Sequence, residues 1–233
     1  MKSTLHWQIS PSEEIVITVT EGIVGEEMTE VRKEDIDVKI KRFVGGNLES
    51  NGYVIYQKQG GTAWIIDPGY SPDKFMKFLK EQDLKLQGII LTHHHYDHTG
   101  GVDKISFETD CKVYIHINDA DMYKKPAEFL YDGDVFDVDG EELRVIHTPG
   151  HTEGGICLMA EKSRLAFTGD TLFNKEVGRV DLEDGDLRKM THTLKEIINP
   201  WAKDITVYPG HGPEATMKFV KEKNPEFLEI LAL

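Results

Sequence analysis

The chain has 233 residues, enough for one large domain or two small ones, with 39% hydrophobic and 29% charged residues, as in soluble globular proteins. The net charge of −14 argues against nucleic-acid and anionic membrane partners, since a surface this acidic repels phosphates. No apolar run approaches the roughly 18 to 20 residues that span a bilayer, the N-terminus lacks an apolar signal core, and the two cysteines form no CxxC pair, so we expect a cytoplasmic protein.

The N-terminal 37 residues are the least informative part of the sequence. The run "EIVITVT" (14–20) predicts a strand, and an acidic stretch, "GEEMTEVRKEDID", follows it. We expect an appended strand and helix here, as an N-terminal extension over residues 1–37.

Strands and helices alternate along the rest of the chain. A first predicted helix, 71–82, has Ser71 as its cap and Pro72 at its first position. A second, 184–199, has apolar residues at spacings of three and four; a third begins at 213, and a short turn follows at 224–233. Runs rich in Val, Ile, Tyr and Thr predict strands at 37–44, 52–58, 62–67, 86–92, 111–117, 142–148, 155–160, 164–170 and 204–210.

The stretch "LTHHHYDHTGG" (91–101) gathers four histidines and an aspartate within six positions. It follows the predicted strand 86–92, and ligands in open α/β sheets commonly lie at the carboxyl ends of strands. Neutral imidazole and carboxylate together suit Zn, Fe, Mn or Co. The sequence therefore indicates a metal site at this strand end.

Three later strand ends also carry residues of the metal-ligand type next to glycine. His151 lies in "HTPGHT", Asp170 in "FTGDTLF" and His211 in "VYPGHGP". Glycine permits the tight turn that aims a side chain from a strand end. Each motif alone is weak, but the order HxHxDH, GHT, GDT and GHG is highly specific for a metal centre.

This order of motifs, together with the loop "GGNLESNGYVI" and with "IIDPG", resembles the metallo-β-lactamase superfamily over about residues 38 to 233. The resemblance implies an α/β fold, a four-layer αββα sandwich of two mixed β-sheets, with a dinuclear metal site at one edge. Residues 38–233 would then form the catalytic domain.

The resemblance also implies a set of ligands for two divalent ions. We expect zinc, although iron and manganese accept the same donors. One ion would take His93, His95 and His151, the second would take Asp97, His98 and His211, and Asp170 would bridge both. A water or hydroxide would lie between the ions.

Three neighbouring side chains are not expected to be ligands. His94 and Tyr96 occupy the variable positions of the HxHxDH motif, and the sequence does not decide whether His94 packs behind the site or faces solvent. His147 precedes the ligand His151 by four residues and is expected to support the site or the fold.

The runs 169–182 and 208–228 are most similar to the glyoxalase II-like, hydroxyacylglutathione hydrolase-type branch, whose members hydrolyse thioesters. The metal-bridging hydroxide would attack the carbonyl of a small-molecule acyl substrate, while Asp97 orients that water or accepts its proton. A thiolate leaves without a strong general acid, because a thiol pKa is only about 8.5. Lys175 and Arg179 are candidate contacts to an anionic substrate, although a solvated lysine and a structural ion pair are the alternative interpretations.

Other functions stay open from the sequence. Only 22 residues follow His211, so we expect most of the C-terminal helical domain that contacts glutathione in full-length glyoxalase II enzymes to be missing. One alternative is a persulfide dioxygenase-like enzyme with one iron held at His93, His151 and Asp170. A lactonase and a non-catalytic metal-binding or partner module are further alternatives. The sequence does not identify the acyl group or the thiol carrier, and it does not indicate whether the chain forms a homo-oligomer.

Overall fold

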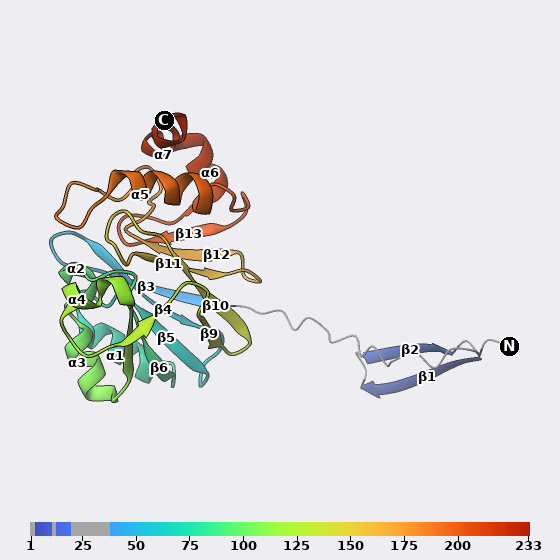
Figure 1. Ribbon diagram of the computed structural model, residues 1–233. Coiled ribbons are helices and arrows are strands. Elements are labelled where there is room, and N and C mark those ends of the chain that lie inside the picture. The colour runs from blue at the N-terminus through green and yellow to red at the C-terminus, as the bar shows by residue number, and fades with distance from the viewer. Residues whose placement is uncertain (1–2, 11–12, 20–37) are drawn as a thin grey trace. The chain divides into compact units, whose positions relative to one another are not determined.

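The computed structural model describes residues 3–10, 13–19 and 38–233 (Figure 1). These residues belong to two compact units, Met1–Glu34 and Asp35–Leu233. In the first unit, β1 (Ser3–Ser10) pairs antiparallel with β2 (Glu13–Val19). Strand β2 confirms the predicted strand 14–20, β1 was not predicted, and the helix expected before residue 38 lies outside the described residues.

One six-stranded sheet of the second unit is built from the first part of its chain. The strand order is β3-β4-β5-β6-β7-β8, with antiparallel pairing from β3 to β5 and parallel pairing from β5 to β8. The strands are β3 (Lys39–Gly45), β4 (Ser50–Tyr56), β5 (Thr62–Ile66), β6 (Lys85–Ile90), β7 (Lys112–His116) and β8 (Glu128–Leu130).

The second six-stranded sheet comes from the later part of the chain. Its order is β14-β13-β12-β11-β10-β9, and all pairs are antiparallel except the parallel pair β12 and β13. The strands are β9 (Val135–Val138), β10 (Glu141–His147), β11 (Ile156–Ala160), β12 (Leu165–Gly169), β13 (Thr206–Pro209) and β14 (Ala215–Thr216).

The helices fall into an early and a late group (Figure 1). The early group is α1 (Pro72–Glu81), α2 (Tyr96–Thr99), α3 (Val102–Thr109), the 3₁₀ turn η1 (Ile117–Asp119) and α4 (Ala120–Tyr123). The late group is α5 (Leu187–His192), its continuation as the π-helix η2 (Thr193–Ile198), α6 (Met217–Lys223) and α7 (Pro225–Ala232).

Buried side chains divide the second unit into four layers. One apolar cluster lies between the two sheets and includes Ile55, Ile66, Leu143 and Phe167. Because neighbouring residues of a strand point to opposite faces, the other residues of each sheet pack outward against helices. Phe75 of α1 and Ile105 of α3 pack with the outer face of the first sheet, whereas Met190 of α5 and Phe227 of α7 pack with that of the second. This arrangement confirms the αββα sandwich of two mixed sheets.

Two local predictions were wrong. Ser71 precedes α1 with a φ of 54°, and its side chain makes no capping hydrogen bond, so Pro72 alone marks the helix start. The expected turn at 224–233 is instead the eight-residue helix α7, which the Asn224 side chain caps by accepting from the Phe227 amide. Helix α3 and strands β8 and β9 were not predicted.

None of the helices within residues 38–233 is long and apolar enough to cross a membrane.

Candidate metal centre

The predicted ligands meet at one edge of the sandwich, where strands of both sheets end. The loop after β6 and the short helix α2 carry the HxHxDH residues from the first sheet. The ends of β10, β12 and β13 carry His151, Asp170 and His211 from the second sheet. Ligand residues up to 118 positions apart in the chain therefore converge on one place.

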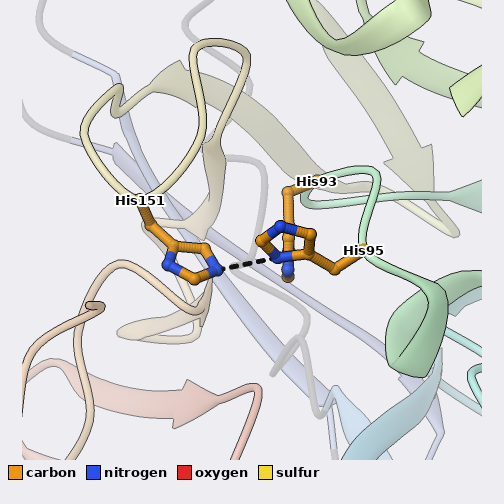
Figure 2. Close-up of side chains that lie close together, drawn as sticks. All are labelled: His93, His95 and His151. Carbon is orange, nitrogen blue, oxygen red and sulfur yellow. Dashed lines mark hydrogen bonds between the residues drawn. The ribbon is translucent and has the colours of Figure 1, made fainter. Parts of the chain in front are cut away.

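The first cluster is formed by His93, His95 and His151, whose ligand atoms all lie within 4.8 Å of one another (Figure 2). His95 Nδ1 lies 3.0 Å from His151 Nε2, although the two rings come from loops of different sheets. His93 and His151 are buried. Three imidazoles that point to a common centre in this way form the ligand pattern of a metal site.

The second cluster is formed by Asp97, His98 and His211 within the same 4.8 Å limit. His211 Nε2 lies 3.2 Å from Asp97 Oδ2, and His98 Nε2 lies 3.4 Å from the same oxygen. The two imidazole nitrogens are 3.3 Å apart. This cluster therefore has the composition that the sequence predicted for a second ion.

Asp170 lies between the two clusters. Its Oδ1 is 3.3 Å from His98 Nε2, while its Oδ2 is 3.6 Å from His151 Nε2 and 3.4 Å from His211 Nε2. One carboxylate is thus within reach of ligand nitrogens from both clusters. This is the position expected of a bridging ligand.

Buried polar atoms without partners show that the site fits metal ions. His93 Nε2 and Asp170 Oδ1 are both buried, and neither has a hydrogen-bond partner in the part of the chain that the structure describes. Burying such atoms without a partner costs free energy. Imidazole nitrogen and carboxylate oxygen are donors that Zn, Fe and Mn accept, so ions bound here would satisfy both atoms.

The far nitrogens of four histidines contact oxygen atoms of the surrounding protein. A partner of this kind fixes the orientation and tautomer of a metal-binding imidazole. The Nδ1 contacts are His93 to Thr92 Oγ1 at 3.0 Å, His98 to Asp67 Oδ2 at 3.2 Å, His151 to the Arg179 carbonyl at 2.8 Å and His211 to the Leu48 carbonyl at 2.9 Å. The Nε2 atoms are thereby directed inward.

The two clusters differ in protonation. Burial lowers the pKa of His93 well below its ordinary value, and burial together with the neighbouring His151 lowers that of His95 to about 4. Burial also opposes charge on His98 and His211, but Asp170 and Asp97 outweigh it, raising the His98 pKa well above 6.5 and the His211 pKa to about 9. His93 and His95 of the first cluster are therefore neutral at pH 7, whereas His98 and His211 of the second retain protons in the metal-free protein.

The three residues set aside as non-ligands point elsewhere. His94 packs behind the first cluster, with Nδ1 3.0 Å from Asp119 Oδ2 and Nε2 3.5 Å from Asp184 Oδ2. The Tyr96 side chain is 72% exposed. The His147 ring stacks on His116 with centroids 4.1 Å apart.

Two further groups of residues also lie close enough together to hold an ion. One is His94, His95 and Asp184, and the other is Asp67, His93 and His98. Each group shares histidines with the two main clusters.

Two buried acids beside the clusters were not identified as supporting residues from the sequence. Asp67 accepts hydrogen bonds from the Thr92 amide and hydroxyl at 2.7 and 2.6 Å and lies beside His98. The motif "IIDPG" contained it and could have indicated this role. Asp119 lies beside His94, and no motif marks it in the sequence.

A pocket of about 630 Å³ opens over both clusters. Leu48, Phe173, Val177 and Leu182 give it an apolar wall, and the predicted contacts Lys175 and Arg179 line it as well. The Arg179 guanidinium pairs with Asp181 at 2.7 and 2.8 Å, which matches the alternative interpretation of this residue as a structural ion pair. Lys175 has no acidic partner within 4.0 Å among the residues that the structure describes.

Comparison with known proteins gives a family and a named relative. Residues 45–211 match the sequence profile of the Metallo-beta-lactamase superfamily. A hydroxyacylglutathione hydrolase of Francisella tularensis subsp. novicida (strain U112) is 36% identical over 176 residues, which cover 75% of this chain and 68% of that protein.

Solved structures show the same fold. The BLEG-1 B3 metallo-beta-lactamase is 29% identical, with a TM-score of 0.75 over 80% of this chain and 98% of that chain. TTHA1623 in a di-iron-bound form is also 29% identical, with a TM-score of 0.72 over 79% of this chain and 98% of that chain.

Proposed function

Because the chain belongs to the metallo-β-lactamase superfamily, we propose that it is a dinuclear metal-dependent hydrolase that cleaves the thioester of a small-molecule acyl substrate. The observation that carries the proposal is the position of Asp170. Its carboxylate lies 3.3 Å from His98 and 3.6 Å from His151, and these histidines belong to different clusters. A carboxylate shared in this way suits two ions that act together on one substrate.

The chain offers each ion its own set of protein donors. Two divalent ions bound there would supply a hydroxide nucleophile near neutral pH and polarise the substrate carbonyl. We propose zinc for both positions, with iron or manganese as the alternatives. His93, His95 and His151 would hold one ion, Asp97, His98 and His211 the other, and Asp170 would contact both.

Asp97 would have a second role in the reaction. It lines the pocket, and hydrogen bonds from His211 and His98 hold its pKa far below the ordinary range even though burial opposes this. The residue is therefore a carboxylate at neutral pH. A carboxylate beside the reacting water can orient it and accept its proton.

The pocket fits an acyl thioester. The apolar side chains of Leu48, Phe173 and Leu182 can pack against an acyl chain and keep water away from it. Lys175 lines the pocket and would contact a negative charge on the thiol carrier, whereas Arg179 is already paired with Asp181. The departing thiolate needs no strong acid from the chain, because a thiol has a pKa of about 8.5.

The named relative supports the thioester reaction, and the di-iron-bound structure supports a pair of ions with iron as an alternative. A persulfide dioxygenase-like enzyme would instead use one iron at His93, His151 and Asp170. The observation in its favour is that Asp170 Oδ2 lies within 4.0 Å of both histidines. Oxygen uptake by the iron-loaded protein that depends on an added persulfide would support that reaction over hydrolysis.

The direct test is turnover of S-D-lactoylglutathione by zinc-loaded protein whose metal content has been measured. The Asp97→Asn variant is compared with Asp103→Asn, which removes the same charge at an exposed position paired with Lys125. Fast turnover that needs Asp97 but not Asp103 is expected. No turnover by protein that holds two ions would exclude glutathione thioesters, and lactones and other acyl carriers would be assayed next.

A further inference from the structure

We propose that Asp119 is a positioning residue that assembles the first cluster by tying together the two loops that carry its histidines. The proposal rests on the proposed metal centre and concerns how the chain prepares one of its two ion sites. Asp119 ends the 3₁₀ turn η1 after β7, and its side chain is only 1% exposed.

One side of the Asp119 carboxylate contacts the loop after β6. The backbone N–H of His94 donates to Asp119 Oδ2 at 3.0 Å, and His94 Nδ1 lies 3.0 Å from the same oxygen. His94 is flanked by His93 and His95, two members of the first cluster. Holding both the backbone and the ring of His94 therefore fixes the short segment from which those two histidines project.

The other side of the same carboxylate contacts the loop after β10. Thr152 Oγ1 donates to Asp119 Oδ2 at 3.0 Å, and the Gly154 N–H donates to Asp119 Oδ1. These residues directly follow His151, the third member of the first cluster. One buried carboxylate thus joins the loops that place His95 Nδ1 3.0 Å from His151 Nε2.

Gly154 allows the loop after β10 to approach Asp119 closely. A Cβ at residue 154 would lie 2.5 Å from the Asp119 backbone nitrogen and 2.6 Å from Asp119 Oδ1. Real Cβ atoms essentially never approach so closely, so any side chain there must push the loop away. The loop can reach Asp119 only because residue 154 is glycine.

The side-chain hydrogen bonds of Asp119 reach residues adjacent to the histidines of the first cluster, namely His94, Thr152 and Gly154. Within the described residues, none of these hydrogen bonds reaches Asp97, His98 or His211. The second cluster uses other supports, since His98 lies beside Asp67 and His211 donates to the Leu48 carbonyl. A change at Asp119 should therefore weaken one ion site and spare the other.

Replacing Asp119 with Asn keeps the shape of the side chain but removes an acceptor. Both carboxylate oxygens accept from a backbone N–H, Oδ2 from His94 and Oδ1 from Gly154. In either orientation, the amide NH₂ of Asn must face one of these donors. One contact to a loop is therefore lost whichever way the amide turns.

The experiment is a zinc titration of the metal-free full chain in competition with a chromophoric chelator, which gives a Kd for each ion. Asp119→Asn should weaken one Kd by about 10- to 100-fold, the range typical for partners of metal-binding histidines, and leave the other within about threefold. Thr152→Val, which removes a single hydrogen bond, should shift the same Kd less. The matched control is Asp132→Asn, because Asp132 is exposed and also accepts from a backbone N–H, that of His147 at 2.8 Å.

Two backgrounds show which ion is affected. In His98→Ala, where the second cluster is broken, Asp119→Asn should still weaken the remaining ion by about 10- to 100-fold. In His95→Ala, the same change should have little effect. Equal weakening of both ions, or no weakening in either background, would overturn the proposal. Thr152→Val decides the question in the same way if Asp119→Asn does not fold.

The outcome also separates this proposal from the proposed function. A wild-type protein that binds a single ion would contradict the two-metal hydrolase. The role of Asp119 would still be decided by whether Asp119→Asn weakens that ion more than Asp132→Asn does.

Discussion

The two clusters of the candidate metal centre contain similar residues, but the groups around their histidines shift the histidine pKa values in opposite directions. Burial and neighbouring imidazoles lower the pKa values of His93 and His95 in the first cluster. His98 and His211 of the second cluster face Asp97 and Asp170, and their pKa values are raised. The neighbours, and not the residue type, therefore decide whether a histidine is ready to bind a metal at neutral pH.

This difference predicts an order of metal loading. An ion entering the first cluster meets the neutral imidazoles of His93 and His95, whereas an ion entering the second must displace protons from His98 and His211. We therefore expect the first cluster to fill first at and below pH 7.

The largest effect is expected when the group shared by the two clusters is removed. Asp170→Ala takes away a carboxylate within 3.6 Å of His98, His151 and His211. We expect turnover to fall by at least about 100-fold, the upper end of the range for changes around a metal site. Steady-state hydrolysis at saturating zinc measures this, and full activity in the variant would show that the clusters work independently.

The second prediction concerns pH. In the metal-free protein the raised pKa of His211, about 9, keeps it protonated below that pH, so protons compete with the second ion below pH 9 and not above it. Affinity for the second ion should rise about tenfold per pH unit from 7 to 9 for each proton displaced. The first ion should show little change over that interval, because the His95 pKa is about 4.

Chelator competition at pH 6, 7, 8 and 9 measures both affinities. His211→Ala removes one proton-binding ligand and should flatten the dependence of the second ion. Equal slopes for the two ions would contradict the contrast between the clusters.

A third prediction tests how tightly the second cluster is packed around Asp170. A Cβ at Gly210 would lie 2.1 Å from Asp170 Oδ1 and 2.7 Å from His98 Cε1. Gly210→Ala should therefore weaken the second ion about tenfold and destabilise the fold by about 1 to 3 kcal/mol. Zinc titration and urea unfolding measure the two effects, and an unchanged second Kd would mean that the turn moves without disturbing the ligands.

A smaller effect is expected where the first sheet supports the strand that leads to His211. The buried Tyr53 hydroxyl of β4 donates to the Pro209 carbonyl of β13 at 2.6 Å. Tyr53→Phe should lower the free energy of unfolding by about 1 kcal/mol. Tyr56→Phe is the control on the same strand, since its hydroxyl makes no hydrogen bond within the described residues, and equal losses in both variants would assign the effect to ring packing.

The smallest effects are expected at the pocket entrance. Lys175→Ala should raise KM for an anionic thioester by about threefold, the effect of one exposed ionic contact. Arg179→Ala should change KM less, because Asp181 already pairs with its guanidinium. A KM that depends more on Arg179 than on Lys175 would show that the pair with Asp181 opens when substrate binds.

The convergence of the candidate ligands could be predicted from the sequence because each of these residues has a local signature. His151, Asp170 and His211 each follow a strand and adjoin glycine, and the HxHxDH residues are contiguous. The layered fold followed from the same motifs through the family resemblance. The structure brings every predicted ligand to one edge, and the assignment of residues to individual ions stays a prediction, as does the boundary of the catalytic domain.

Apart from Asp67, which lies in the motif "IIDPG", the supporting residues could not be predicted because their contacts join distant parts of the chain without any local pattern. Asp119 is 25 residues from His94 and 35 from Gly154, and the partner of His211 is a backbone carbonyl 163 residues away. Backbone acceptors leave no mark in a sequence. Strand β8 escaped prediction because it has only three residues, and β9 because it has only four.

The candidate ligands come from both sheets, and this affects how resistant the protein is to proteolysis. Residues 93–98 follow a strand of the first sheet, whereas His151, Asp170 and His211 follow strands of the second, so ions bound by these residues would crosslink the two halves of the sandwich. Free metal at 100 times its Kd adds about 2.7 kcal/mol to the stability of a fold that alone holds the site. Resistance to proteolysis should therefore follow the concentration of free metal, and intact protein should be lost faster when that metal is withdrawn.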